Sequence, residues 1–192
     1  MRQLLNCYLN EARGTDLTAE VALYEAARLR HDNLTDLPGA LDLLREHRRR
    51  FPTGTLTYEV RLSMAELLPK LAHYREALTN IDWLLDAPTG AERRGELLLL
   101  RGHVLREGFE NWSGAERAYA QAAETRGGDG RAADPASFWR AVCLESLGRK
   151  DEARRAYAAY LARPRPSLRE QAELRLRALE REHSTRGAAQ SR

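Results

Sequence analysis

An alanine that recurs every 37 or 38 residues constrains the fold of this chain more than any other feature of its sequence. It occupies four positions, Ala40, Ala77, Ala115 and Ala153. A larger apolar residue follows each alanine by four positions, and a small residue precedes each by twelve or thirteen. These companions are Leu44, Ile81, Tyr119 and Tyr157 after the alanines, and Ala27, Ala65, Gly102 and Ala141 before them. A fixed spacing with matching residue types predicts an array of repeated structural units.

Each unit is predicted to contain two short amphipathic helices, A and then B. The small residues let the two backbones approach closely, and the larger side chain one turn further fills the groove beside that contact. Prolines follow three of the alanines by eleven or twelve residues, at Pro52, Pro88 and Pro164. Because proline cannot continue the hydrogen-bond ladder, it is expected to end helix B. One hairpin cannot bury its own apolar face, so neighbouring hairpins are expected to stack.

The predicted helices follow this register along the chain. We expect caps at Ser113 with Glu116 and at Asp134, a glycine stop at Gly148, and a flexible loop at 127–130. The eight A and B helices are placed at 19–31, 38–50, 56–71, 74–86, 92–107, 113–125, 135–147 and 150–162.

The predicted organisation has four parts. Residues 1–16 form an N-terminal helix, which can also be read as a partial repeat. Residues 17–166 form the four repeats, and residues 167–182 form a C-terminal capping helix that opens with a capping box at Ser167 and Glu170. Residues 183–192 are expected to be a disordered tail.

These residues resemble the tetratricopeptide repeat family, in a divergent bacterial form with 37–38-residue units. The best match runs from Asp134 to Pro166 and rests on small residues, on Leu147-Gly148 and on Ala153. The usual period of the family is about 34 residues. The resemblance implies an all-α, right-handed superhelix of about four hairpins with helical caps at both ends. It also implies a scaffold for protein–protein interaction.

Composition narrows the function classes. The chain has 192 residues and a formal net charge of +3, and 43% of its residues are apolar. This apolar content is too high for a disordered chain. The net charge is too low for a dedicated nucleic-acid binder. No run of 18 apolar residues occurs, so a membrane-spanning helix is not predicted. The chain as written shows no export signal, so a cytoplasmic protein is expected, and a periplasmic or envelope-associated one if a segment precedes it.

No catalytic residue, metal ligand or cofactor is predicted. The five histidines do not form a metal-binding spacing, and the glycines do not form a phosphate-binding loop. Cys7 and Cys143 lie too far apart to suggest a cysteine framework, and Cys143 is expected to be a buried thiol. We therefore expect a protein that is not an enzyme.

The resemblance implies that the A helices line a concave groove. The charged residues that it places in this groove are all acidic, and several apolar residues lie among them, which suggests a partner segment with basic and apolar side chains. Asp32 falls on the same pattern, and the competing interpretation is that the register slips by one residue and the acidic pattern is accidental. The predicted groove residues are Glu25, Leu29, Glu59, Leu62, Glu66, Leu100, Glu107, Phe138, Val142 and Glu145.

Two other functions compete with this one. The first is binding to nucleic acid or to an anionic membrane through arginines of the B helices, although nucleic acid is not the favoured ligand and a membrane is expected only indirectly. The second is a structural role in a bacterial envelope assembly, and the sequence leaves open whether the chain is a monomer or part of a complex. The candidate anion contacts are Arg48, Arg49, Arg50, Arg154 and Arg155.

Overall fold

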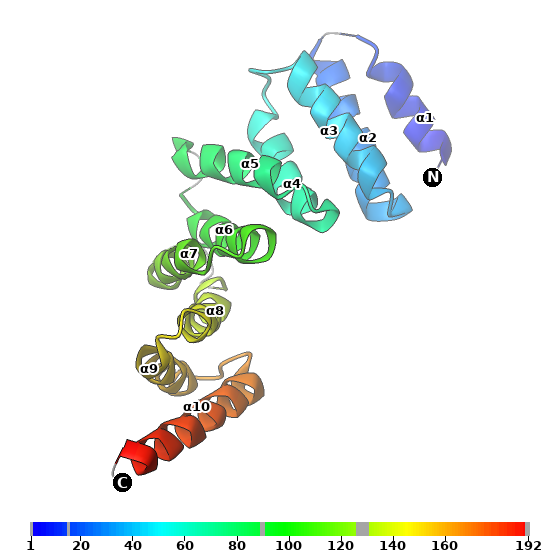
Figure 1. Cartoon of the computed structure of the whole chain (residues 1–192). Coiled ribbons are helices and arrows are strands. Elements are labelled where there is room, and N and C mark those ends of the chain that lie inside the picture. Colours follow the sequence, from blue (N-terminus) through cyan, green and yellow to red (C-terminus); the bar gives the residue numbers. More distant parts are fainter. Residues whose placement is uncertain (1, 15, 89–90, 126–130, 191–192) are drawn as a thin grey trace. The chain divides into compact units, whose positions relative to one another are not determined.

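The computed structural model describes residues 2–14, 16–88, 91–125 and 131–190, and these residues form helices and loops without a strand (Figure 1). The all-α fold class is confirmed. Helices follow one another along the described chain in this order: α1 (Arg2–Glu11), α2 (Leu17–Leu34), α3 (Leu37–Arg50), α4 (Thr57–Leu67), the 3₁₀ helix η1 (Leu68–Leu71), α5 (Tyr74–Asp86), α6 (Arg94–Phe109), α7 (Trp112–Glu124), α8 (Ala133–Ser146), α9 (Lys150–Leu161) and α10 (Arg169–Gln190).

The chain divides into two compact units, residues 1–86 and residues 87–192. The N-terminal unit holds α1 to α5, and the C-terminal unit holds α6 to α10. In each unit the helices pack in pairs, α2 on α3 and α4 on α5, then α6 on α7 and α8 on α9. Helix α3 also packs on α4, and α7 on α8, so hairpins stack on each other inside each unit. The end helices α1 and α10 pack on α2 and α9.

The predicted helix boundaries agree with the structure to within about three residues. The second A helix is the irregular one, because its last turn, which contains Pro69, is the 3₁₀ helix η1. The expected end of the last helix near residue 182 is wrong, since α10 continues to Gln190. The stretch 183–190 contains no proline, so each of its residues can donate to the hydrogen-bond ladder. Residues 191–192 and the predicted loop at 127–130 lie outside the described residues.

The repeat positions are core positions. The four repeat alanines are fully buried, and so are Ile81, Tyr119 and Tyr157, while Leu44 is 3% exposed. The small residues of the A helices are buried as well. The closest of these contacts is at Gly102, where an added Cβ atom would lie 2.4 Å from the ring of Tyr119. The period in the sequence is therefore the period of hairpin packing.

The turn between helix A and helix B places a left-handed residue at the same position in each of the four hairpins of the described residues. Its central residue lies five positions before the repeat alanine and has a left-handed backbone conformation, with φ between 49° and 74°. In each hairpin the N–H of the repeat alanine then donates to the carbonyl of the residue four positions earlier, at 2.9–3.0 Å, and starts helix B. The left-handed residues are Thr35, Ala72, Glu110 and Gly148.

Three of the expected caps are made differently from the prediction. Helix α7 is capped by Asn111, whose Oδ1 accepts a 2.8 Å hydrogen bond from the N–H of Gly114, and not by Ser113.

The Asp134 carboxylate does not cap α8, because it accepts hydrogen bonds from the hydroxyl of Tyr160 and from the backbone and hydroxyl of Ser167. Helix α10 begins at Arg169, so Leu168 and not Ser167 stands directly before it, and the Ser167 hydroxyl donates to Asp134. Asp134 therefore ties α8 to the end of α9 and to the segment before α10.

Exchanging residues at the left-handed turn position tests the shared geometry. Gly148→Ala is expected to destabilise the protein by about 1 kcal/mol, because a Cβ atom is disfavoured at positive φ even though no atom lies within 4 Å of it. Ala72→Gly is expected to stabilise it by a few tenths to about 1 kcal/mol, because glycine removes that strain. Chemical denaturation of both variants measures the two free energies, and changes of the same sign in both would contradict the prediction.

Gly102 and Gly95 provide a matched test of the core, because both are buried glycines of α6. Gly102→Ala is expected to cost about 1–3 kcal/mol through overpacking against the buried Tyr119 ring, despite the higher helix propensity of alanine. Gly95→Ala places its Cβ atom no closer than 3.4 Å to another atom and is expected to be neutral or stabilising by up to about 1 kcal/mol. Equal effects in the two variants would rule out the tight contact at Gly102.

Candidate functional site

No group of three or more His, Cys, Asp or Glu side chains in the described part of the chain is arranged to hold a metal ion. Cys143 is buried, as expected, and burial raises the pKa of its thiol to about 12, which leaves the thiolate scarce at neutral pH. Among the helices of the described residues, none combines the length and the apolar character that a membrane span requires.

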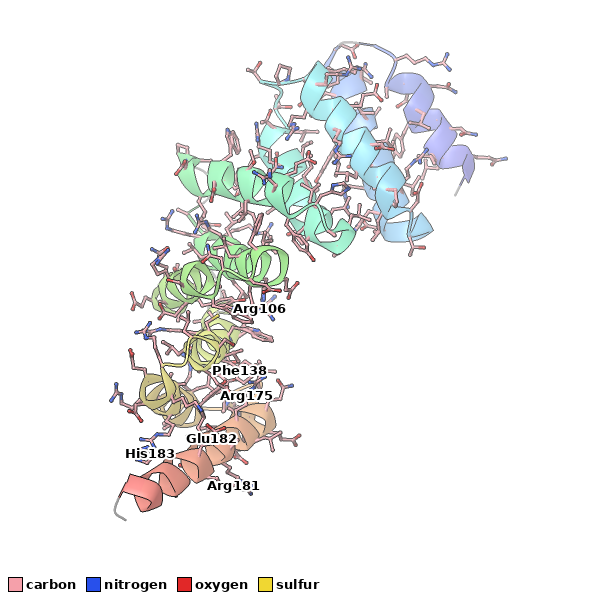
Figure 2. The ribbon with its side chains drawn as sticks, viewed as in Figure 1. Arg106, Phe138, Arg175, Arg181, Glu182 and His183 are labelled. Atoms are coloured by element: carbon pink, nitrogen blue, oxygen red, sulfur yellow. The ribbon has the colours of Figure 1, made fainter. Side chains whose placement is uncertain are left out.

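Three of the predicted groove residues belong to the core. Phe138 on α8 is 1% exposed, Val142 is 6% exposed, and Leu29 on α2 is 8% exposed. Phe138 packs against Tyr157 and Tyr160 of α9, with ring centroids 6.0 and 5.7 Å apart, inside the C-terminal unit (Figure 2). The prediction that Phe138 and Val142 line an open groove is therefore wrong, because helices packed on α8 cover them.

An open cleft of about 200 Å³ lies in the N-terminal unit, between α2 and α4 with α3 at its base. Its buried lining residues are Ala27, Leu44 and Leu67. The hydroxyl groups of Tyr24 and Ser63 lie 3.3 Å apart and link the two walls. We call this feature the α2–α4 cleft, and its complete lining is Tyr24, Ala27, Arg28, His31, Asp32, Leu44, Ser63, Glu66 and Leu67.

The charges at the α2–α4 cleft are mixed, with an excess of carboxylates. Arg28 lines the cleft, and its Nη1 atom lies 3.1 Å from Oε1 of Glu25, so its charge is already paired. Asp32 lies 2.6 Å from Nδ1 of His31, and the exposed Glu66 adds a further carboxylate. The acidic, partly apolar groove therefore stays a prediction, and in this cleft an arginine and a histidine lie beside the carboxylates.

The predicted positions on α2 are displaced by about one residue from those that line the α2–α4 cleft. Glu25 and Leu29 instead line a smaller cleft of about 120 Å³ against Leu4 and Tyr8 of α1. Of the predicted residues on α4, Glu66 lines the α2–α4 cleft, whereas the exposed Glu59 and the half-buried Leu62 do not. The prediction missed four residues that line the cleft, namely Tyr24, Arg28, His31 and Ser63. In the sequence, only the possibility that the register slips by one residue pointed to them.

The predicted groove residues of the C-terminal unit are engaged with their neighbours or partly covered. Glu145 accepts hydrogen bonds from the hydroxyl of Tyr157, at 2.8 Å, and from Nη1 of Arg175 on α10, at 3.0 Å. Glu107 is exposed and forms an ion pair with Arg106, and Leu100 is half-buried. These residues stabilise the hairpin stack and do not surround a cavity in the described part of this unit.

A second cluster on α6 to α8 is also fully used by packing. The guanidinium of Arg106 lies 4.2 Å from the ring centre of Trp139, and its Nε atom donates to the hydroxyl of Tyr119 at 3.4 Å. That hydroxyl lies 2.9 Å from Nδ1 of His103 and forms a hydrogen bond with it. Burial and the charge of Arg106 lower the pKa of His103. The cluster is a satisfied hydrogen-bond network rather than an open site.

The candidate anion contacts are mostly paired with carboxylates. Arg48 lies 3.5 Å from Glu76, Arg50 lies 3.1 Å from Glu46, and Arg154 lies 3.3 Å from Asp151. The remaining two, Arg49 and Arg155, are exposed on α3 and α9. Pairing reduces the positive charge that each group presents to a ligand.

A buried pair that the sequence did not reveal connects the first two hairpins. His47 of α3 is fully buried, and its Nε2 atom lies 3.6 Å from Oε1 of Glu20 on α2. Glu20 is also buried, and its carboxylate accepts hydrogen bonds from the N–H of Leu56 at 2.8 Å and the hydroxyl of Thr55 at 3.3 Å. Glu20 therefore fixes the loop that leads into α4.

Comparison of the sequence with models of known protein families gives no match, and comparison with curated proteins gives none either.

The buried His47 makes stability depend on pH. Burial lowers the pKa of His47, Glu20 opposes part of this shift, and Arg50 adds to it. A lowered folded-state pKa means that the unfolded chain binds more protons, so stability is complete above the unfolded value of about 6.5 and decreases as the pH falls below it. His103 acts in the same direction.

We expect the free energy of unfolding to fall between about pH 7.5 and 5.5, and to fall less steeply in His47→Phe, which keeps an aromatic ring beside Phe51 and cannot titrate. Denaturation curves measured across this range for both proteins test the expectation. Comparison with the wild type isolates His47 because His103 is present in both. Parallel pH profiles would show that His47 does not contribute.

Proposed function

We propose that this chain is a non-catalytic scaffold that binds a segment of a partner protein in the α2–α4 cleft. The observation that carries the proposal is the composition of this cleft. It combines buried apolar residues between consecutive A helices with exposed carboxylates at Asp32 and Glu66. A partner segment with an apolar anchor and a basic side chain complements both features.

The tetratricopeptide-like architecture is part of the same proposal. Its support is the repeated register, in which the left-handed turn residue, the repeat alanine and the larger apolar residue keep one spacing in all four hairpins. In such an architecture the A helices form one continuous right-handed concave surface. A preformed surface loses little conformational entropy when it binds its partner.

The two competing functions have less support. Binding of nucleic acid or an anionic membrane through the B helices requires open positive charge, and Arg50 and Arg154 are paired with carboxylates. A structural role in an envelope assembly remains a prediction from the family resemblance alone. The α2–α4 cleft is the feature that favours a peptide-binding scaffold over both.

Two fluorescein-labelled peptides of equal length test the proposal, one composed of leucine and arginine among neutral residues and the other with glutamate in place of arginine. We expect the basic peptide to bind more tightly, with an affinity that falls as salt rises from about 0.05 to 0.5 M. Fluorescence anisotropy measures both affinities. Equal binding of the two peptides without salt dependence would contradict the proposed charge preference.

A matched pair of charge reversals on α4 locates the binding site. Glu66→Lys is expected to weaken binding of the basic peptide by about ten-fold or more, because it reverses a charge that lines the cleft. Glu59→Lys makes the same change on the same helix outside the cleft and is expected to have little effect. Circular dichroism checks that both variants fold, and equal losses in the two would place binding elsewhere.

A further inference from the structure

A separate group of arginines lies in the N-terminal unit, where α3, α4 and α5 meet. Arg45 and Arg48 come from α3, Arg61 comes from α4, and Glu76 comes from α5. Glu76 lies 2.6 Å from Nη2 of Arg45 and 3.5 Å from Nη2 of Arg48. Arg45 also lies 4.0 Å from Asp42, so two carboxylates neutralise its charge. Arg48 shares Glu76 with Arg45, so its charge is neutralised less completely.

Arg61 is the member of this group that has no carboxylate partner among the described residues. Its guanidinium lies over the indole of Trp83, 4.4 Å from the ring centre, and its Nη1 atom is 3.4 Å from Oδ1 of Asn80. Asn80 is fully buried and is held by a 2.9 Å hydrogen bond from its Nδ2 atom to the carbonyl of Glu76. Neutral groups on α5 therefore fix the position of Arg61 and leave its charge uncompensated.

The surroundings of Arg61 disfavour its charge. Burial lowers the pKa of Arg61, and the nearby charge of Arg48 lowers it further. The Nε atom of Arg61 is buried and has no hydrogen-bond acceptor. The repulsion between two neighbouring guanidinium groups costs free energy, which a bound anion would offset.

The group is open to solvent on one side. Trp83 is 38% exposed, and the Arg48 side chain is 35% exposed. A guanidinium that is stacked on an aromatic ring presents its remaining N–H groups in one plane, which matches the two oxygens of a carboxylate or phosphate. The group shares no residue with the α2–α4 cleft.

We propose that Arg48 and Arg61, with Trp83 as the stacking platform, form a binding site for a single oxyanion, either a phosphate group or a carboxylate. The site is independent of the proposed peptide-binding cleft. Two neighbouring arginines recognise the doubly charged phosphate best, so phosphate is expected to bind more tightly than carboxylate.

Titration with inorganic phosphate at constant ionic strength tests the site, with the indole N–H signal of Trp83 in ¹H–¹⁵N NMR spectra as the readout. The chain has three tryptophans, and the spectrum of Trp83→Phe assigns the signal. We expect a saturable shift of the Trp83 signal and no saturable shift of the other two indoles. A parallel titration with acetate distinguishes the two sources, because a shift with acetate indicates a carboxylate ligand as well.

Charge-matched variants make the test specific. Arg61→Gln and Arg48→Gln are each expected to weaken phosphate binding by about ten-fold, whereas Arg49→Gln, which removes the same charge at an exposed position on α3, is expected to leave it within about two-fold. Arg61→Lys is expected to recover little, because lysine keeps the charge and loses the planar fork. Arg48→Gln keeps the test valid if Arg61→Gln disturbs the fold. Linear shifts of all three indoles, or equal titrations in Arg48→Gln and Arg49→Gln, would overturn the proposal.

Discussion

The close approach of helix A and helix B within each hairpin is the interaction on which the rest of the structure depends. It is possible because the facing residues are small, and at Gly102 even one added methyl group would meet the ring of Tyr119. The left-handed turn residue then places the repeat alanine at the first hydrogen bond of helix B, at the same register in each hairpin. This combination fixes which faces of each helix are buried and which are exposed.

The two candidate sites lie at different surfaces that this packing leaves exposed. The α2–α4 cleft opens between consecutive A helices, where short side chains such as Ala27 and Ser63 leave space between longer charged ones. The Arg48–Arg61 site lies where two B helices meet around an A helix, and there the positive side chains outnumber the carboxylates that can neutralise them. One site offers apolar volume with negative charge, and the other offers positive charge on an aromatic platform.

Particular residues explain where sequence reasoning succeeded and where it failed. The helix boundaries were predictable because the repeat alanines, the prolines and Gly148 act locally on the backbone. The groove residues on α2 were displaced by one position because α2 is buried against both α1 and α3, so its apolar residues do not mark one face. The cap at Asp134 was misplaced because Ser167, more than thirty residues later, takes that carboxylate.

The sequence by itself determined that the chain is all-α, that its helices pair as hairpins, and that twelve repeat positions form the core. These properties follow from periodic apolar residues and local backbone constraints, which can be read along a single chain. Only the tertiary structure decided that Leu29, Phe138 and Val142 are buried, that Glu20 and His47 are buried together, and that Arg61 has no carboxylate partner among the described residues. Burial and charge pairing depend on neighbours from distant segments, and a local pattern does not contain that information.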